Sequence, residues 1–187
     1  MAPGAEVRFM FLAASYFEAG DATRGGFLTT NVATEPLEFR CTSSIRPTKL
    51  QQMLYGHMLS EYVLCQLIGI PLFEAAKEKP NLILVNDSVF LAMRPRVTVA
   101  VLWLGRHSQA ADVLPKDAHL EDYVLTHQSG KFEPIITFTH HEFADELLEA
   151  RRLLSELTKE HDALEPFDRV DRALEHVHKE KTGEKQR

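Results

Sequence analysis

The pattern of hydrophobic and polar residues divides the first part of the chain into strand-like stretches. The run from Val7 to Phe17 is apolar, rich in aromatic residues and free of proline and glycine, which predicts a buried strand. Turn-forming residues occupy 20–26 and a β-type sequence resumes over 27–30, so the pattern indicates a hairpin. Apolar and polar residues alternate with period two over 37–42, which predicts a third, half-buried strand.

A long helical stretch follows these strands. Thr48 is placed to cap the first free amides of a helix, and the composition over 49–76 is helical. We expect this helix to be broken or kinked near Gly56 and again over 69–71, where glycine and proline interrupt the pattern. Pro80 ends the helical stretch.

Further strands are predicted in the second half of the chain. The continuous apolar run over 81–87 is typical of a central strand buried on both faces. A second run, over 96–104, alternates valines with other residues and predicts another strand. Residues 112–130 resemble an irregular connection with a short helix around 120–124, and 134–138 predicts an edge strand in which a leading proline is tolerated.

The C-terminal part of the chain has helical periodicity. Thr139 with Glu142 three residues later fits a capping box, and apolar residues then recur at helical spacing as far as Leu157. A second helix with one apolar face is predicted over 166–178. The C-terminal helical pair is therefore expected to cover one face of the sheet.

Together these elements predict an α/β (or α+β) fold. We expect a mixed sheet of about five strands in the order βββαβ, followed by the C-terminal helical pair. With 187 residues the chain has room for one ordinary domain with a helical appendage. The predicted division is an α/β core over 1–138, a C-terminal helical segment packed on that core over 139–179, and a flexible tail over 180–187.

Composition narrows the class of protein. Hydrophobic residues make up 44% and charged residues 26%, which are globular values and exclude wholesale disorder. A net charge of -6 argues against a polyanion binder by overall charge. No uninterrupted apolar run approaches the ~18 residues of a membrane span, and the start of the sequence lacks the basic region of a signal peptide. We therefore expect a cytoplasmic protein, in which Cys41 and Cys65 are packing residues.

Positive charge is concentrated in two windows without acidic residues. One window lies between Glu38 and Glu61, and the other lies between Asp87 and Asp112. If the fold brings the windows together, their cations would form an anion-binding surface. The alternative is that buried strands exclude carboxylates and tolerate arginine at their ends. The cations concerned are Arg40, Arg46, Lys49, Arg94, Arg96 and Arg106.

The segment between the third strand and the helix is dense in polar residues. Thr42, Ser43 and Ser44 offer hydroxyls and backbone amides beside Arg40 and Arg46, which is one way to build an anion seat. A well-capped strand-to-helix crossover is the other interpretation. A motif block of an uncharacterised bacterial protein family is similar to the residues GGFL, PLEFRCTSSIRPT and LYG, taken in this order. We attach no activity to that family.

The order βββαβ and the stretch LILVNDS resemble the ribonuclease H-like fold. That resemblance implies one catalytic carboxylate on the first strand, one on the first helix and one at the end of the fourth strand, holding two Mg²⁺ ions for phosphodiester cleavage. Asp87 matches the third position and Glu61 the second. The first strand has no carboxylate before Glu18, and the expected position falls near Ala14. The resemblance therefore implies an inactive relative at least as readily as a nuclease.

Other motifs carry no chemistry that we can assign. The residues His140, His141 and Glu142 diverge in direction on a strand or at a helix start, so we interpret them as solvent-facing residues around a helix cap rather than metal ligands. The sequence contains no GxSxG, Walker A or GxGxxG motif.

Two functional hypotheses follow. The favoured one is a non-catalytic binding or scaffold component of a cytoplasmic assembly, without a cofactor, which contacts an anionic or acidic partner through the basic corner formed by Arg40, Arg46 and Lys49. Its partner would be a protein, with nucleic acid possible and no membrane; the oligomeric state is left open. The alternative is a metal-dependent nuclease of the ribonuclease H-like type, using Asp87, Glu61 and Glu18 with Mg²⁺.

Overall fold

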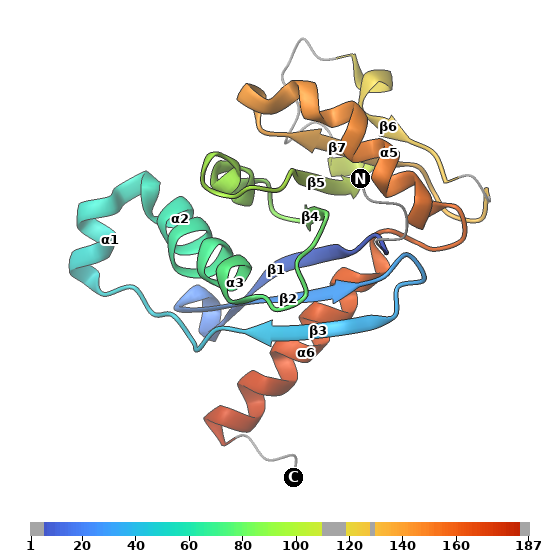
Figure 1. Cartoon of the computed structure of the whole chain (residues 1–187). Helices are drawn as coiled ribbons and strands as arrows, with labels where there is room; N and C mark the ends of the chain where they lie inside the picture. Colours follow the sequence, from blue (N-terminus) through green and yellow to red (C-terminus); the bar gives the residue numbers. More distant parts are fainter. Residues whose placement is uncertain (1–5, 110–118, 128–129, 184–187) are drawn as a thin grey trace.

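The computed structural model describes residues 6–109, 119–127 and 130–183, and these residues build a mixed sheet with helices on both faces (Figure 1). The strand order is β3-β2-β1-β4-β5-β7-β6. The α/β prediction is confirmed, but the described residues form seven strands rather than about five. The strands are β1 (Phe9–Phe17), β2 (Ala22–Thr30), β3 (Pro36–Cys41), β4 (Leu82–Val85), β5 (Val101–Arg106), β6 (Val124–Leu125) and β7 (Ile135–Thr139).

The helices differ in regularity. The α-helices are α1 (Lys49–Tyr55), α2 (Leu59–Glu61), α3 (Ile70–Ala75), α5 (Leu147–Thr158) and α6 (Glu165–Thr182). A π-helix spans Tyr62–Gly69, and 3-10 segments span Glu18–Gly20, Gly56–Met58, Ser88–Arg96, His107–Gln109, Leu120–Asp122 and His141–Glu146. We call the continuous run from Lys49 to Ala75 the kinked helix.

The kinked helix begins where the sequence predicts. The Thr48 hydroxyl accepts a hydrogen bond from the Gln51 amide at 3.2 Å, and the Gln51 side chain accepts one from the Thr48 amide at 2.9 Å. The predicted kink occurs at Gly56, whose φ of 51° ends α1. The second predicted break does not occur. Pro71 has no amide to donate, and the helix passes this point because the Ile70 amide bonds five residues back to Cys65, in π geometry.

Two apolar cores lie on opposite faces of the sheet. On one face the kinked helix and the Ser88–Arg96 segment cover residues such as Leu12 and Val85. On the other face α5 and α6 cover residues such as Phe11 and Leu84. Consecutive residues of one strand therefore serve different cores, as the alternation of side chains in a strand requires.

The two glycines of β2 allow helices to approach the sheet closely. We expected Gly25 and Gly26 to lie in a turn, and this prediction is wrong. A Cβ on Gly25 would lie 2.0 Å from Ile68 of the π-helix, and one on Gly26 would lie 2.8 Å from Leu174 of α6. The actual turn is confined to residues 18–21, where Glu18, Ala19 and Gly20 have positive φ. The second strand consequently starts five residues earlier than its apolar pattern indicates.

Three further boundary predictions are wrong. Residues 96–100 precede β5, because the chain first forms the 3-10 segment Ser88–Arg96, which buries Phe90 and Met93. The connection predicted as irregular contributes the short strand β6, which pairs with β7. The Thr139 capping box does not form, since Thr139 belongs to β7 and the His140 side chain accepts the Glu142 amide instead.

One helical run is long and apolar enough to cross a membrane by length and composition, namely the kinked helix. We did not expect this, because the apolar residues are not continuous. A helix that packs in the core of a protein can have the same length and composition. In this helix Val63, Leu64 and Ile68 are buried against the sheet. The packing of these three residues accounts for the apolar character of the helix.

Candidate functional site

The carboxyl ends of β1 and β4 lie side by side at the centre of the sheet. The two strands run parallel, with Leu12 opposite Val85, and both residues belong to the core under the kinked helix. Because side chains alternate, Ala14 faces the same side as Leu12, and it packs against this core. Asp87 follows Val85 by two residues. The strand register thus brings the Ala14 position and Asp87 to one end of the sheet.

Asp87 is held by neighbours on both sides. Its Oδ1 accepts a hydrogen bond from the Val89 amide at 2.9 Å, which caps the Ser88–Arg96 segment. Its negative charge also acts on the Tyr16 hydroxyl at the end of β1. Burial raises the pKa of Tyr16, and the negative charge and hydrogen bond of Asp87 raise it further. The phenol therefore stays protonated at neutral pH.

Glu61 belongs to the kinked helix, at the end of α2. It is exposed and lies one turn before Cys65, whose buried thiol donates a hydrogen bond to the Val89 carbonyl at 3.2 Å. Burial raises the pKa of Cys65 to about 12, and the negative charges of Glu61 and Asp87 add to this effect. The two carboxylates therefore both lie close enough to act on one thiol. A thiol in this state is no nucleophile, which agrees with the packing role expected for Cys65.

Glu18 does not join this pair. It lies in the turn after β1, where its carboxylate binds Arg46 at 2.5 Å and lies 3.6 Å from His178 Nε2 of α6. The hydrogen bond from Arg46 holds the pKa of Glu18 below its ordinary value. Within the described ranges, no three residues of the types His, Cys, Asp and Glu are grouped as a metal site. The three carboxylates of the nuclease hypothesis thus do not converge, and Ala14 stands where the resemblance requires the first of them.

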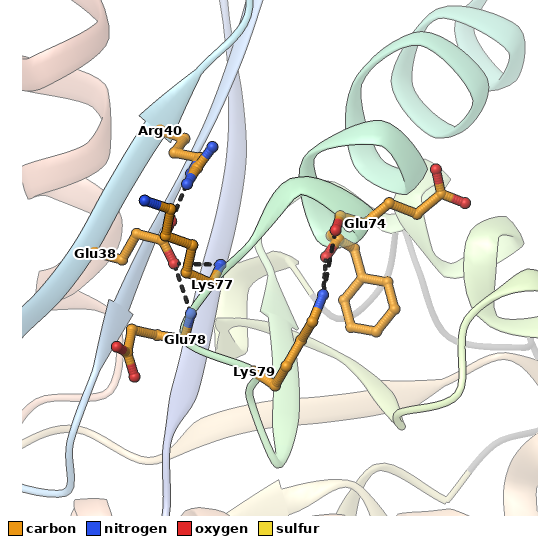
Figure 2. A network of polar contacts seen from close by, with 7 residues as sticks. Glu38, Arg40, Glu74, Lys77, Glu78 and Lys79 are labelled. Carbon is orange, nitrogen blue, oxygen red and sulfur yellow. Dashed lines mark hydrogen bonds and ion pairs between the residues drawn. The ribbon is translucent and has the colours of Figure 1, made fainter.

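The arginines of the first acid-free window are engaged by carboxylates. Arg46 binds Glu18 as described, and Arg40 binds Glu38 at 2.5 Å. The second oxygen of Glu38 accepts the backbone amides of Lys77 and Glu78, both at 2.8 Å, which ties β3 to the end of α3 (Figure 2). Burial raises the pKa of Glu38, but these amides and Arg40 lower it by more.

Lys49 and the polar crossover show no anion seat of the predicted kind. Lys49 begins α1 and is exposed. Thr42 is used within the sheet, because its carbonyl accepts Arg24 at 2.7 Å and its hydroxyl accepts the Gly25 amide at 3.1 Å. Ser43 is exposed, and the Ser44 hydroxyl is buried. The crossover interpretation describes these contacts better than the anion seat does.

The second window contributes one cation to the site. Arg94 binds Glu146 and packs over the Phe143 ring at 4.3 Å, and Arg106 lies 3.6 Å from Glu133. Arg96 differs from these two arginines. Its guanidinium donates to the Gln66 side chain, one residue after Cys65, and its charge acts on the Cys65 thiol. Arg96 is therefore the predicted cation whose charge acts on the same thiol as the charges of Glu61 and Asp87.

A small hollow opens next to the site. It has a volume of about 140 Å³ and is bordered by Tyr16, Pro47, Gln52 and Leu59, among others. It lies between the end of β1 and the first turns of the kinked helix. This hollow and Tyr16 were not anticipated, because the sequence shows neither which face a strand residue occupies nor how α1 bends at Gly56. The sequence signal that could have identified Tyr16 is the alternation of side chains in β1, which puts Leu12, Ala14 and Tyr16 on the same face.

The histidine pair serves as a cap. His140 precedes the 3-10 segment, and its Nδ1 lies 3.9 Å from the Glu142 carboxylate. The rings of His140 and His141 are 4.4 Å apart. Their interpretation as residues around a helix cap agrees with these contacts, but the His140 side chain is only 17% exposed and does not face the solvent as predicted.

Comparison with known proteins identifies the fold. No family model matches the chain, and no curated protein matches it by sequence. Solved structures of endonuclease V match along nearly the whole chain, although their sequence identity is low. The human enzyme has a TM-score of 0.63 at 15% identity, covering 94% of this chain and 86% of its own. The enzyme of Streptomyces avermitilis has a TM-score of 0.67 at 12% identity, covering 95% of this chain and 83% of its own.

A third match was solved with nucleic acid. The Ciona intestinalis endonuclease V, with a TM-score of 0.58 at 12% identity, covers 94% of this chain and 87% of its own. Its structure is a complex with a 24mer DNA containing an inosine followed by a ribo-adenosine. The chain thus shares the fold of a nuclease family, which is compatible with the ribonuclease H-like resemblance.

These matches contradict the favoured hypothesis. The interpretation as a non-catalytic binding or scaffold component, together with its emphasis on protein interaction, is wrong in the light of a fold shared with nucleases. The matches agree better with the alternative, a nuclease. They give no support to a protein partner, whereas nucleic acid is bound by a protein of the same fold. The cytoplasmic location and the bacterial motif block stay predictions.

Proposed function

We propose that this chain is a divalent-metal-dependent nuclease, which acts on nucleic acid at the carboxyl ends of β1 and β4. The observation that carries this proposal is that the charges of Glu61 and Asp87 both act on one buried thiol, in a chain that shares the fold of endonuclease V structures. Ligands of α/β proteins commonly bind outside the carboxyl ends of parallel strands, and Asp87 follows the end of such a strand, β4.

The donor set supports one Mg²⁺ ion and does not fit two. Mg²⁺ is often held by one or two carboxylates plus water and substrate phosphates, and Glu61 and Asp87 provide such a pair. A second ion would need the first-strand carboxylate, but this position is Ala14, and Glu18 is paired with Arg46. Phosphate approaching two carboxylates would be repelled without a counter-charge, so we expect substrate binding to depend on the metal.

The residues of the chain have separate roles in this proposal. Glu61 and Asp87 would hold the ion, which supplies positive charge to the phosphate group and activates the attacking water. Arg96 is exposed, its charge acts on the same thiol, and it would contact a neighbouring phosphate of the substrate. The hollow beside Tyr16 gives the nucleic acid a recess at the edge of the site.

Cleavage of labelled oligonucleotides by the full chain tests this proposal. The panel contains single-stranded DNA, duplex DNA, RNA and a DNA with an inosine followed by a ribo-adenosine, the feature present in the Ciona complex. We expect cleavage with Mg²⁺ and none with EDTA. Glu61→Gln and Asp87→Asn should each lower the rate more than about 100-fold, since a bound metal contributes several kcal/mol.

Glu142→Gln is the matched control, because it removes an exposed carboxylate outside the site. Its rate should equal that of the unaltered chain. Cleavage that persists in EDTA or in both site variants would contradict the proposal. Oligonucleotide binding with no cleavage of any member of the panel would contradict it as well.

A further inference from the structure

The strand β3 forms one edge of the sheet. It stands at the end of the strand order, next to β2, and Figure 1 shows it as the outermost strand on that side. The Thr42 amide, just after β3, donates to the Gly25 carbonyl of β2 at 2.8 Å. Hydrogen-bonding directions alternate along a strand, so the backbone groups of Arg40 also point toward β2, whereas those of Phe39 and Cys41 point outward. Outward-pointing backbone groups of an edge strand can pair with a further strand.

The contacts of β3 with the α3–β4 connection lie over the sheet and not beyond its edge. The Glu38 carboxylate accepts the Glu78 amide at 2.8 Å (Figure 2). Glu78 in turn binds Arg8, which precedes β1, at 2.8 Å. This connection therefore crosses the face of the sheet from β3 toward β1. Phe39 is 38% exposed, whereas Leu28, its neighbour in β2, is 6% exposed, so the edge carries a large apolar side chain that the fold leaves partly uncovered.

The charges of β3 are complementary to a second copy of the same strand. Glu38 and Arg40 flank Phe39 and lie on one face, because side chains alternate along a strand. If two β3 strands pair antiparallel about a two-fold axis at Phe39, Glu38 of each copy lies directly opposite Arg40 of the other. Directly opposite residues have Cβ atoms about 4.5–5.5 Å apart, which is closer than the roughly 7 Å between alternate residues of one strand. The ion pair within each strand, at 2.5 Å, thus gains a nearer partner across the axis.

The neighbouring registers bring like charges together. Outward-pointing residues must pair with outward-pointing residues, so the next possible axes lie at Glu38 and at Arg40. These axes place two glutamates or two arginines directly opposite each other, which is destabilising. The register with β2 shifts between Thr29 and Thr30, opposite the start of β3, so the regular part of the edge is Glu38–Cys41 and contains Phe39. Charge and regularity therefore favour the same register.

We propose that two copies of this chain associate through β3, in antiparallel register about Phe39, so that their two sheets become one continuous sheet. The order acid, apolar residue, base is its own complement when reversed, which identifies the partner as the same chain. Closed two-fold dimers are the commonest assemblies of identical chains. The surface is separate from the carboxyl ends of β1 and β4, and this inference does not rest on the proposed function.

Sedimentation velocity of the full chain over a wide range of concentration, up to about 1 mM, tests this proposal. We expect the mass to approach that of two chains as the concentration rises. Arg40→Glu places acids opposite acids and Glu38→Lys places bases opposite bases, so each variant should dimerise more than about 10-fold more weakly. Phe39→Pro removes an outward amide, keeps the ladder with β2, and should weaken the dimer as well. Leu148→Glu is the control, because it alters an exposed residue of α5 and should dimerise like the unaltered chain.

A mixture of the two charge variants separates the interface from folding. Opposite charges meet only in the mixed dimer, in which the Arg40→Glu chain pairs with the Glu38→Lys chain. We expect the mixture to form a dimer at a concentration at which neither variant does so alone, which a loss of folding could not produce. A chain that stays monomeric at every concentration overturns the proposal and leaves the edge of β3 to a strand of another protein. A dimer that persists equally in Arg40→Glu and Phe39→Pro, or a mixture that stays monomeric, overturns it too.

Discussion

The two faces of β1 meet different surroundings at the same end of the strand. On the α6 face, Phe11 packs edge-on against Phe167 at 5.3 Å, and Ser15 donates to Asp171 at 2.9 Å. On the kinked-helix face, Leu12 is buried and Ala14 packs against the same core, but Tyr16 at the end of the strand is 56% exposed and borders the hollow. One face of β1 therefore packs against α6, and the other face borders the candidate site.

The difference shows which helix stabilises the fold. α6 inserts a stripe of apolar residues into the core, whereas α1 has no buried residue and exposes Leu50, Met53 and Leu54. The long C-terminal helix is thus part of the sheet's support. The first turns of the kinked helix contribute little to it and instead border the hollow beside the site.

The largest expected effect comes from opening the α6 face. Phe167→Ala removes a ring that is 3% exposed and should lower the free energy of unfolding by about 3–5 kcal/mol. Leu54→Ala, at a position that is 74% exposed, should change it by less than about 0.5 kcal/mol. Urea denaturation followed by circular dichroism measures both. Equal losses in the two variants would refute the distinction between α6 and α1.

A smaller loss is expected from crowding the opposite face. Gly25→Ala places a Cβ 2.0 Å from Ile68, so the π-helix must move away from β2, at a cost of about 1–3 kcal/mol. The same denaturation experiment applies. In an Ile68→Ala background the added methyl should cost less, because the atom that it meets is gone. A cost that does not depend on Ile68 would mean that the close approach is not what requires glycine.

The third prediction restores an acid to the first strand. Ala14→Asp should raise Mn²⁺ affinity about tenfold, equivalent to about 1.4 kcal/mol, because a further carboxylate joins Glu61 and Asp87. Without metal the added charge should lower the melting temperature, and Mn²⁺ should recover it. Ala14→Asn has the same size without the charge and serves as the control. Equal Mn²⁺ affinity in the two variants would show that Ala14 does not face the metal site.

The smallest effect concerns Asp171 on the α6 face. Burial raises its pKa, as do the nearby Asp168 and Glu175, although the Ser15 hydrogen bond lowers it. A raised pKa means that ionising Asp171 opposes folding. Its contribution is most favourable below the unfolded pKa near 3.8 and is lost as the pH rises through the folded value.

Asp171→Asn should therefore stabilise the protein at pH 7 by less than about 1 kcal/mol, given partial solvent screening. The amide oxygen can still accept from Ser15. The advantage over the unaltered chain should shrink as the pH is lowered toward 4, which urea denaturation at several pH values measures. A constant advantage would mean that the charge of Asp171 is not its cause.

Local signals in the sequence predicted several elements correctly. Thr48 with Gln51 capped the kinked helix, Gly56 kinked it, and the continuous apolar run before Asp87 became the central strand β4. The predictions that were wrong concern long-range packing. Gly25 was predicted in a turn, but it is a strand residue that lies against Ile68 of the π-helix. Thr139 was predicted as a helix cap, but it belongs to a strand that pairs with β5.

The site was predictable only in part for the same reason. Asp87 and Glu61 were predicted from element order, and the charges of both act on the Cys65 thiol. Glu18 pairs with Arg46 because the turn after β1 has positive φ angles. The spacing of residues in the sequence does not reveal this pairing. Tyr16 was missed because its place at the hollow depends on how the kinked helix packs over the end of β1.

The break at Gly56 has a consequence for how the molecule can change over time. Since α1 buries none of its side chains, most substitutions among its seven residues should cost little stability. Selection against unstable variants should therefore remove fewer mutations in α1 than in the strands of the sheet. Descendants of this protein can therefore remodel the rim of the hollow while the sheet beneath it stays the same.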